Sequence, residues 1–205
     1  MPKWKGSYIF TVAKRATAGR PDVTTHAEIE QVAFRLFAER GFVATTLDDI
    51  AQEVGVGRRT IFRYYSSKND IPWGQFDRTL EGFREIFASM PEGGSLYQDI
   101  SCAVIAFNRC PENASPPHAE RLRLILETPA LQAHSALRYG EWRRVISEYA
   151  ASRLAVDPED LVPRMWGHVA LALALTAYEV WLDEPDAEIT DLLEISMAAL
   201  VHQVR

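Results

Sequence analysis

The sequence has 205 residues, with 47% hydrophobic side chains, 10% aromatic side chains and a formal net charge of −6. This composition excludes an intrinsically disordered chain, because such chains have too few apolar residues to bury a core. The length allows one large or two small globular domains. The charge is uneven: residues 1–75 carry 11 Lys and Arg against 8 Asp and Glu, and residues 76–205 carry 11 against 20. The first part of the chain is therefore basic enough to bind an anionic partner.

Signals for export, membrane insertion and metal binding are missing from the sequence. The apolar stretch at residues 8–13 is shorter than the roughly 7–15 apolar residues of a secretory signal. The longest apolar run, residues 169–175, is far below the roughly 18 residues that span a bilayer. Cys102 and Cys110 would lie about 12 Å apart along one helix, too far for a disulfide. We expect a soluble cytoplasmic protein without metal, cofactor or membrane contact.

Apolar residues recur at helical spacing through most of the chain, and no segment alternates as a strand does. The predicted fold class is therefore all-α. A first helix is expected to start at a cap formed by Thr24 or Thr25 and to end at Gly41. A second is expected to start at Thr46, where Asp49 would complete a capping box.

A tight turn at residues 55–57 separates this second helix from a short third helix. The third helix is expected to start at Arg58 and to end at Tyr64 or Tyr65. A short helix, a turn that contains glycine and another short helix form a helix-turn-helix.

The later helices are separated by proline and glycine. A fourth is expected at residues 68–89, capped by Ser67, with a bend or restart near residues 69–70 because Pro72 lacks a backbone donor. The others are expected at residues 96–110, 117–127, 130–154, 159–183 and 187–204. The domain prediction is a basic extension at residues 1–22, a helix-turn-helix domain at 23–67, and a ligand-binding and dimerisation domain at 68–205.

Residues 47–68, LDDIAQEVGVGRRTIFRYYSSK, carry the pattern with the greatest information about function. They resemble the signature of TetR-family bacterial transcription regulators, in which an Ile-Ala-x-x-Ala/Val-Gly-Val turn precedes Thr-Leu/Ile-Tyr/Phe-x-His/Tyr-Phe/Tyr and then Ser-Lys. The resemblance extends over residues 25–71. It implies a TetR-like protein that binds double-stranded operator DNA as a homodimer and senses a small molecule.

Basic side chains at the start of the third helix are candidates for base contacts. Arg58 and Arg59 would each read a guanine through two hydrogen bonds, and Thr60 and Arg63 are expected on the same outward face. The alternative is a solvated helix face. The N-terminal extension would contact phosphates or a minor groove, unless it is a free tail, through Lys3, Lys5, Lys14, Arg15 and Arg20.

The resemblance also implies phosphate contacts. By position in the family pattern, Thr46, Tyr64 and Lys68 correspond to residues that bind the DNA backbone. Gly57 departs from the Ser or Thr that the family often has there, so one phosphate donor is expected to be missing. One of Tyr64 and Tyr65 is expected to pack in the three-helix core.

In the body, the last two predicted helices are apolar on more than one face, as expected of helices buried on two sides. The resemblance places the homodimer contact on them. Aromatic residues of the body belong more often to a core than to a pocket, yet the resemblance implies an elongated apolar cavity. The candidates for its lining, including one arginine for an anionic head group, are Trp73, Phe76, Phe107, Arg123, Tyr139, Trp142, Trp166 and Tyr178.

A narrower resemblance concerns residues 71–77 and 121–149, which are similar to actinobacterial TetR regulators associated with mycofactocin biosynthesis. It implies a long-chain acyl-CoA effector. The expected function is that of a repressor released from a palindromic operator by an apolar or acyl-CoA ligand. The alternatives are a helical interaction module without specific DNA binding and an enzyme, for which the sequence offers no catalytic motif.

Overall fold

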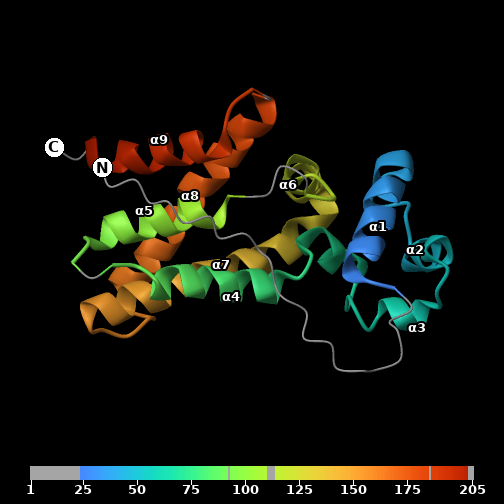
Figure 1. Cartoon of the computed structure of the whole chain (residues 1–205), viewed down its shortest axis with the longest axis horizontal. Helices are drawn as coiled ribbons and strands as arrows, with labels where there is room; N and C mark the ends of the chain where they lie inside the picture. The colour runs from blue at the N-terminus through green and yellow to red at the C-terminus, as the bar shows by residue number, and fades with distance from the viewer. Residues whose placement is uncertain (1–23, 92, 110–113, 185, 203–205) are drawn as a thin grey trace.

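The computed structural model describes residues 24–91, 93–109, 114–184 and 186–202, and all regular structure in these ranges is helical. The predicted all-α class is confirmed. Helices α1 to α3 form one end of the molecule, and α4 to α9 form the body (Figure 1). The elements are α1 (His26–Arg40), α2 (Leu47–Val54), α3 (Arg58–Ile61), η1 (Lys68–Trp73), α4 (Phe76–Ala88), α5 (Leu96–Phe107), α6 (His118–Glu127), η2 (Pro129–Leu131), α7 (Gln132–Leu154), α8 (Leu161–Asp183) and α9 (Ile189–His202).

The first two helices begin and end where local sequence signals predict. Thr25 caps α1 and Thr46 caps α2, each within a capping box. Thr46 Oγ1 accepts a hydrogen bond from the backbone N–H of Asp49 at 3.1 Å. α2 ends at Gly55, which has a left-handed backbone with φ +78°, and the next N–H donates back to the carbonyl of Ala51 at 2.9 Å.

A first hydrophobic cluster joins α1, α2 and α3. Ile29, Ile50 and Ile61, one from each helix, are fully buried in it. Ile71 of η1 and Leu131 of η2 belong to the same cluster, so the packing of the three-helix end extends past residue 67. The three short helices are thereby fixed to one another and to the body.

The third helix is shorter than predicted. It ends at Ile61, and residues 62–64 form a turn. The N–H groups of Arg63 and Tyr64 donate to the carbonyls of Thr60 and Ile61 at 3.1 and 2.9 Å, three residues back rather than four. The chain therefore tightens before Tyr65, whose side chain enters the core.

The predicted single helix at residues 68–89 is wrong, as is the bend placed near residues 69–70. Residues Lys68–Trp73 form the 3-10 helix η1, and α4 begins only at Phe76. The break lies at Gly74, which has φ +59°, a conformation that favours glycine. Pro72 has no N–H, so an α-helix that began at Lys68 would lack the bond from residue 72 back to residue 68.

The body helices are confirmed, with ends that differ from the prediction by a few residues. α8 packs against α7 on one side and α9 on another (Figure 1). At Gly167 of α8, an added Cβ would lie 2.8 Å from the carbonyl oxygen of Arg143 on α7, so this close approach requires glycine. The predicted extension at residues 1–22 lies outside the described residues, as does Cys110.

Candidate functional site

The side chains predicted to read bases lie on the outer side of α3 and of the turn that follows it. Ile61 anchors the helix in the core, while Arg58, Arg59 and Arg63 are exposed and Thr60 is half-buried. Within the described residues, Arg59 and Arg63 have no ion-pair partner. The site is therefore a short helix and turn whose basic residues face solvent and whose opposite side packs against buried isoleucines.

Arg58 is held by two neighbours that the sequence analysis did not single out. Its Nη1 lies 3.0 Å from Oδ2 of Asp48, in the first turn of α2. Its guanidinium carbon lies 5.4 Å from the ring centroid of Phe62. The side chains of Arg58 and Asp48 are 56% and 63% exposed. Such exposed ion pairs are weak, so the guanidinium can exchange Asp48 for another acceptor.

Thr46 lies at the N-terminus of α2, with an exposed side chain. Its hydroxyl donates to Oδ2 of Asp49 at 2.6 Å, and this bond holds the pKa of Asp49 below its usual range. The hydroxyl must rotate away from Asp49 to donate to a phosphate. The positive end of the α2 dipole favours an anion at the same place.

Lys68 and Tyr64 are occupied inside the three-helix end. The ammonium of Lys68 donates to the carbonyls of Phe42 and Thr45 at 2.6 and 2.7 Å, and burial lowers its pKa. The hydroxyl of Tyr64 donates to the carbonyl of Thr24 at 2.6 Å. In this arrangement both residues fasten loops to the core instead of facing solvent, so their expected phosphate contacts remain predictions.

Tyr65 is the tyrosine that packs in the core, with 3% of its surface exposed. Its hydroxyl donates to Oε1 of buried Glu30 on α1 at 2.6 Å. Burial and the Glu30 carboxylate raise the pKa of Tyr65, so it remains a donor. Arg121 of α6 forms an ion pair with the same carboxylate and donates to the carbonyl of Pro72 at 2.7 Å. One polar cluster thus connects the end of the α3 turn, α1, η1 and α6.

A second polar cluster joins η1 to α7. Oδ1 of Asp70 lies 2.7 Å from Nη2 of Arg138 and 2.9 Å from Nε2 of His134. Although burial opposes ionisation, hydrogen bonds from Arg138 and Ser67 lower the pKa of Asp70. The body therefore contacts η1 from both α6 and α7.

Most of the predicted pocket aromatics lie inside the body, in two groups. In the first, the Trp73 ring lies 5.1 Å from that of Phe76 and 5.5 Å from that of Tyr139. In the second, the Phe83 ring lies 4.5 Å from that of Phe107 and 5.3 Å from that of Trp142. Trp142 belongs to the body core, and the partly buried Phe76 and Phe107 pack against it. These rings extend from η1 to α5.

The other three predicted pocket residues, Tyr178, Arg123 and Trp166, lie elsewhere. Tyr178 of α8 donates to Oδ1 of buried Asn108. Arg123 is exposed on α6, where it donates to the carbonyl of Leu182 at 2.8 Å, so it does not line the interior. The eight predicted residues therefore do not surround one common space.

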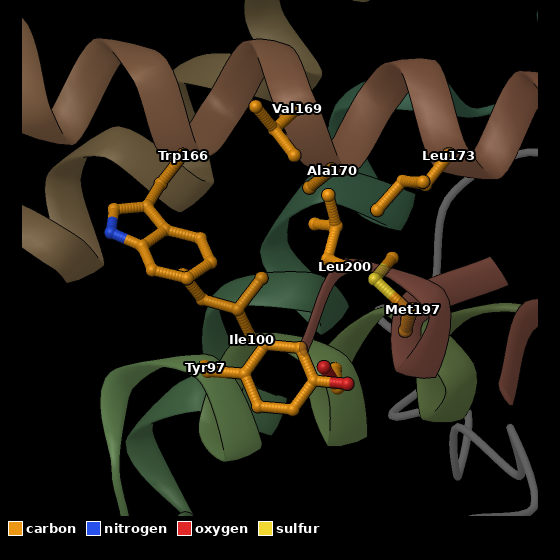
Figure 2. Close-up of a pocket in the computed structure, with 9 residues that line it drawn as sticks. Tyr97, Ile100, Trp166, Val169, Ala170, Leu173, Met197 and Leu200 are labelled. Atoms are coloured by element: carbon orange, nitrogen blue, oxygen red, sulfur yellow. The ribbon is translucent and has the colours of Figure 1, made fainter. Parts of the chain in front are cut away.

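Trp166 lines a separate apolar hollow between α5, α8 and α9, which is too narrow to hold a water molecule. Figure 2 shows Trp166, Val169 and Leu173 on one helix facing Ile100 and Tyr97 on another. The complete lining is Tyr97, Ile100, Ser101, Trp166, Val169, Ala170, Leu173, Met197 and Leu200.

Comparison with known proteins decides the family. Residues 29–71 match the family described as bacterial regulatory proteins, tetR family, and residues 95–205 match the MftR C-terminal domain. The chain is 39% identical over 175 residues to the mycofactocin biosynthesis transcriptional regulator MftR of Mycobacterium tuberculosis, an alignment covering 85% of this chain and 88% of that protein. The chain belongs to the TetR family of bacterial transcription regulators. Its resemblance to mycofactocin regulators is confirmed as well.

Solved TetR-family structures have the same fold. FadR of Thermus thermophilus, determined in complex with lauroyl-CoA, has a TM-score of 0.57 at 20% identity and covers 86% of this chain, with 93% of its own length matched. FadR of Bacillus halodurans has a TM-score of 0.60 at 16% identity, covering 88% of this chain and 100% of its own. As a TetR-family member, the chain is a DNA-binding transcription regulator.

The TetR-family body also exposes apolar side chains on its last two helices. Leu161 of α8 is 83% exposed and Ile195 of α9 is 66% exposed. By length and composition α8 could cross a membrane, although none of its uninterrupted apolar runs is long. Only 28% of its most apolar window is buried, despite packing against α7 and α9. Packing within one chain therefore does not account for the apolar surface of α8.

Sequence analysis missed Asp48, Phe62 and Glu30 in the DNA-binding end, and Arg121 of the body, which contacts that end. Glu30 left a detectable signal, because it directly follows Ile29 on the buried side of α1 and a carboxylate there needs a partner. The partner, Arg121, is 91 residues away in the chain, and spacing does not predict such a contact.

Proposed function

We propose that this TetR-family chain is a homodimeric repressor that binds a palindromic operator and is released by an apolar effector. The observation that carries the proposal is the outward position of Arg58 and Arg59 on α3 and of Arg63 in the turn after it, while fully buried Ile61 fixes the other face of the helix. A rigid basic helix of this kind suits the major groove.

The arginines at the start of α3 would make the base contacts. Arg58 and Arg59 are expected to donate two hydrogen bonds each to guanine, while Thr60 and Arg63 support them from the same face. Thr46 is expected to bind a phosphate at the N-terminus of α2. We assign Lys68 and Tyr64 a supporting role, because Lys68 already donates to the loop after α1 and Tyr64 to the carbonyl of Thr24.

A second copy of the chain would cover the exposed apolar faces of α8 and α9. Several of their large apolar side chains face solvent: Leu161, Val162, Met165, Val180 and Ile195. Exposed apolar surface of this extent is typical of an interface. A two-fold dimer would present two α3 helices to successive major grooves, roughly 34–36 Å apart.

The effector is expected to be an apolar chain, with a long-chain acyl-CoA as the first candidate. Two observations support it: the aromatic rings that extend from Trp73 to Phe107, and the hollow between α5, α8 and α9. FadR of Thermus thermophilus, which shares the fold, was solved with lauroyl-CoA. Because the hollow is too narrow for a water molecule, its helices must separate to admit the ligand.

Release of DNA is expected to pass through α6. Arg121 holds Glu30 of α1, and Glu30 accepts from Tyr65 at the end of the α3 turn. A ligand that displaces α6 would strain this cluster and change the separation of the two α3 helices. The coupling must be reciprocal, so operator DNA would weaken effector binding by the same factor.

The division into residues 23–67 and 68–205 is part of the proposal, and so is the absence of catalysis. The relatives are named as regulators, and no group of three metal-ligating side chains occurs among the described residues. The deciding experiment is footprinting of the purified protein on DNA around its own gene. Protection of a palindrome that the double variant Arg58→Ala, Arg59→Ala no longer protects supports the proposal, and absence of any protected site contradicts it.

A further inference from the structure

Phe62 ends α3 on the same outward side as the arginines. Its side chain is 45% exposed, and it lies one helical turn after Arg58, whose guanidinium carbon is 5.4 Å from the ring centroid. Single exposed apolar side chains are common on proteins, so exposure alone assigns no role. The position between basic residues on the proposed DNA-reading face distinguishes this ring.

The core does not explain the ring. Ile61 and Tyr65, on either side of it in the chain, fill the first hydrophobic cluster with 0% and 3% of their surface exposed. Phe62 is not a member of that cluster. The ring instead packs against the guanidinium of Arg58, which also forms the 3.0 Å ion pair with Asp48.

The ring has no hydrogen-bond donor or acceptor, and this limits what it can read. In the major groove, guanine, adenine and cytosine present only polar groups, while thymine adds a methyl group at C5. An arginine that reaches a guanine edge with a ring packed beside it brings that ring to the adjacent base pair. We propose that Phe62 is a specificity-determining residue, contacting the methyl group of a thymine next to the guanine bound by Arg58.

This inference rests on the proposed function, because α3 must lie in the major groove. The test begins with selection of an operator from random-sequence duplexes by the full-length protein. Each thymine of the selected duplex is then replaced by deoxyuridine, which lacks only the methyl group, one symmetric pair at a time. One lost methyl contact is expected to weaken binding about fourfold. Because each replacement removes the methyl group from both half-sites, the measured weakening should be about sixteenfold.

The variant Phe62→Ala is expected to bind the thymine and deoxyuridine duplexes equally. Its ring is exposed, so the fold is retained, which a melting curve checks. The salt dependence of binding should match the wild type, because no phosphate contact changes. Leu137→Ala, which truncates a 69% exposed side chain on α7, is the matched control and should keep the full deoxyuridine penalty.

Two results would overturn the inference. In one, no thymine shows a wild-type penalty that Phe62→Ala removes. In the other, Phe62→Ala weakens binding but keeps the penalty, which means that the ring only braces Arg58. Failure to select any duplex is a different result, because it contradicts the proposed DNA binding itself.

Discussion

Arg121 of α6 forms an ion pair with Glu30 of α1, although the two residues are 91 positions apart in the chain. Their side chains are 19% and 10% exposed. The same guanidinium lies 5.2 Å from the ring centroid of Phe34 and donates to the carbonyl of Pro72. A single side chain of the body therefore holds both the first helix of the DNA-binding end and η1.

Replacing Glu30 with glutamine should destabilise the protein by about 3 kcal/mol, because it leaves the charge of Arg121 buried without its partner. Urea unfolding measures this change. Glu39→Gln on the same helix removes an exposed pair with Arg35 and should leave the free energy of unfolding nearly unchanged. Equal effects of the two substitutions would show that the Arg121 contact does not stabilise the junction.

Removing the carboxylate that holds Arg58 should strengthen DNA binding. Asp48→Asn frees the guanidinium and removes a negative charge from the surface that faces phosphates, so we expect affinity to rise several-fold at low salt and less at high salt. Fluorescence anisotropy with operator DNA checks it. Asp77→Asn, which removes a 95% exposed carboxylate from α4, is the control and should leave affinity unchanged. Weaker binding by Asp48→Asn would mean that the ion pair pre-positions Arg58 for DNA.

Gly57 caps α3 without a side-chain hydrogen bond, and a Cβ there would meet no atom within 4 Å. Its φ of −75° suits any residue, so Gly57→Ser should raise stability by about 0.5 kcal/mol through a new cap. Gly55→Ser, at φ +78°, should instead lower stability by about 1 kcal/mol. Thermal denaturation of the pair separates the two cases, and a shift in the same direction for both would contradict the backbone argument.

Acid should destabilise the protein through His118. Burial and the neighbouring Arg121 lower the pKa of His118 from 6.5 to about 4. Between these values the unfolded chain binds a proton that the folded chain does not, so stability is lost as pH falls from about 6.5 to about 4, by on the order of 3 kcal/mol. The His118 ring packs near that of Trp181, so phenylalanine can replace it. His118→Phe should remove most of this pH dependence, which unfolding measured at several pH values checks. His168→Gln, at an exposed site, should retain it.

The proposed dimer predicts different effects for two similarly exposed side chains. Ile195 on α9 is 66% exposed and Leu137 on α7 is 69% exposed. Ile195→Glu should give monomers in light scattering and weaken operator binding at least about a hundredfold, because one half-site contact is lost. Leu137→Glu should leave both properties unchanged. A dimeric Ile195→Glu variant would move the interface away from α9.

Local signals in the sequence were enough to place the first two helices of the DNA-binding end. Thr46 with Asp49 at the start of α2, and Gly55 after it, act within a few residues, so their roles are visible without tertiary structure. Arg58, Arg59 and Arg63 are exposed as predicted, on the side away from the buried Ile50, Ala51 and Ile61. The helical class and most of the helix bounds follow from the same short-range physics.

The partners of the polar side chains depended on packing instead. Tyr64 and Tyr65 are chemically alike, and only the tightened turn after Ile61 places the second against Glu30. The sequence allowed Lys68 to face DNA, and only the fold brings the carbonyls of the loop after α1 within hydrogen-bond distance of its ammonium. The aromatic residues of the body look alike in the sequence, but some lie in the core and Trp166 lines the hollow. Their positions depend on which faces of α5, α7 and α8 meet. Spacing along one helix cannot specify this, because it is a long-range property of the fold.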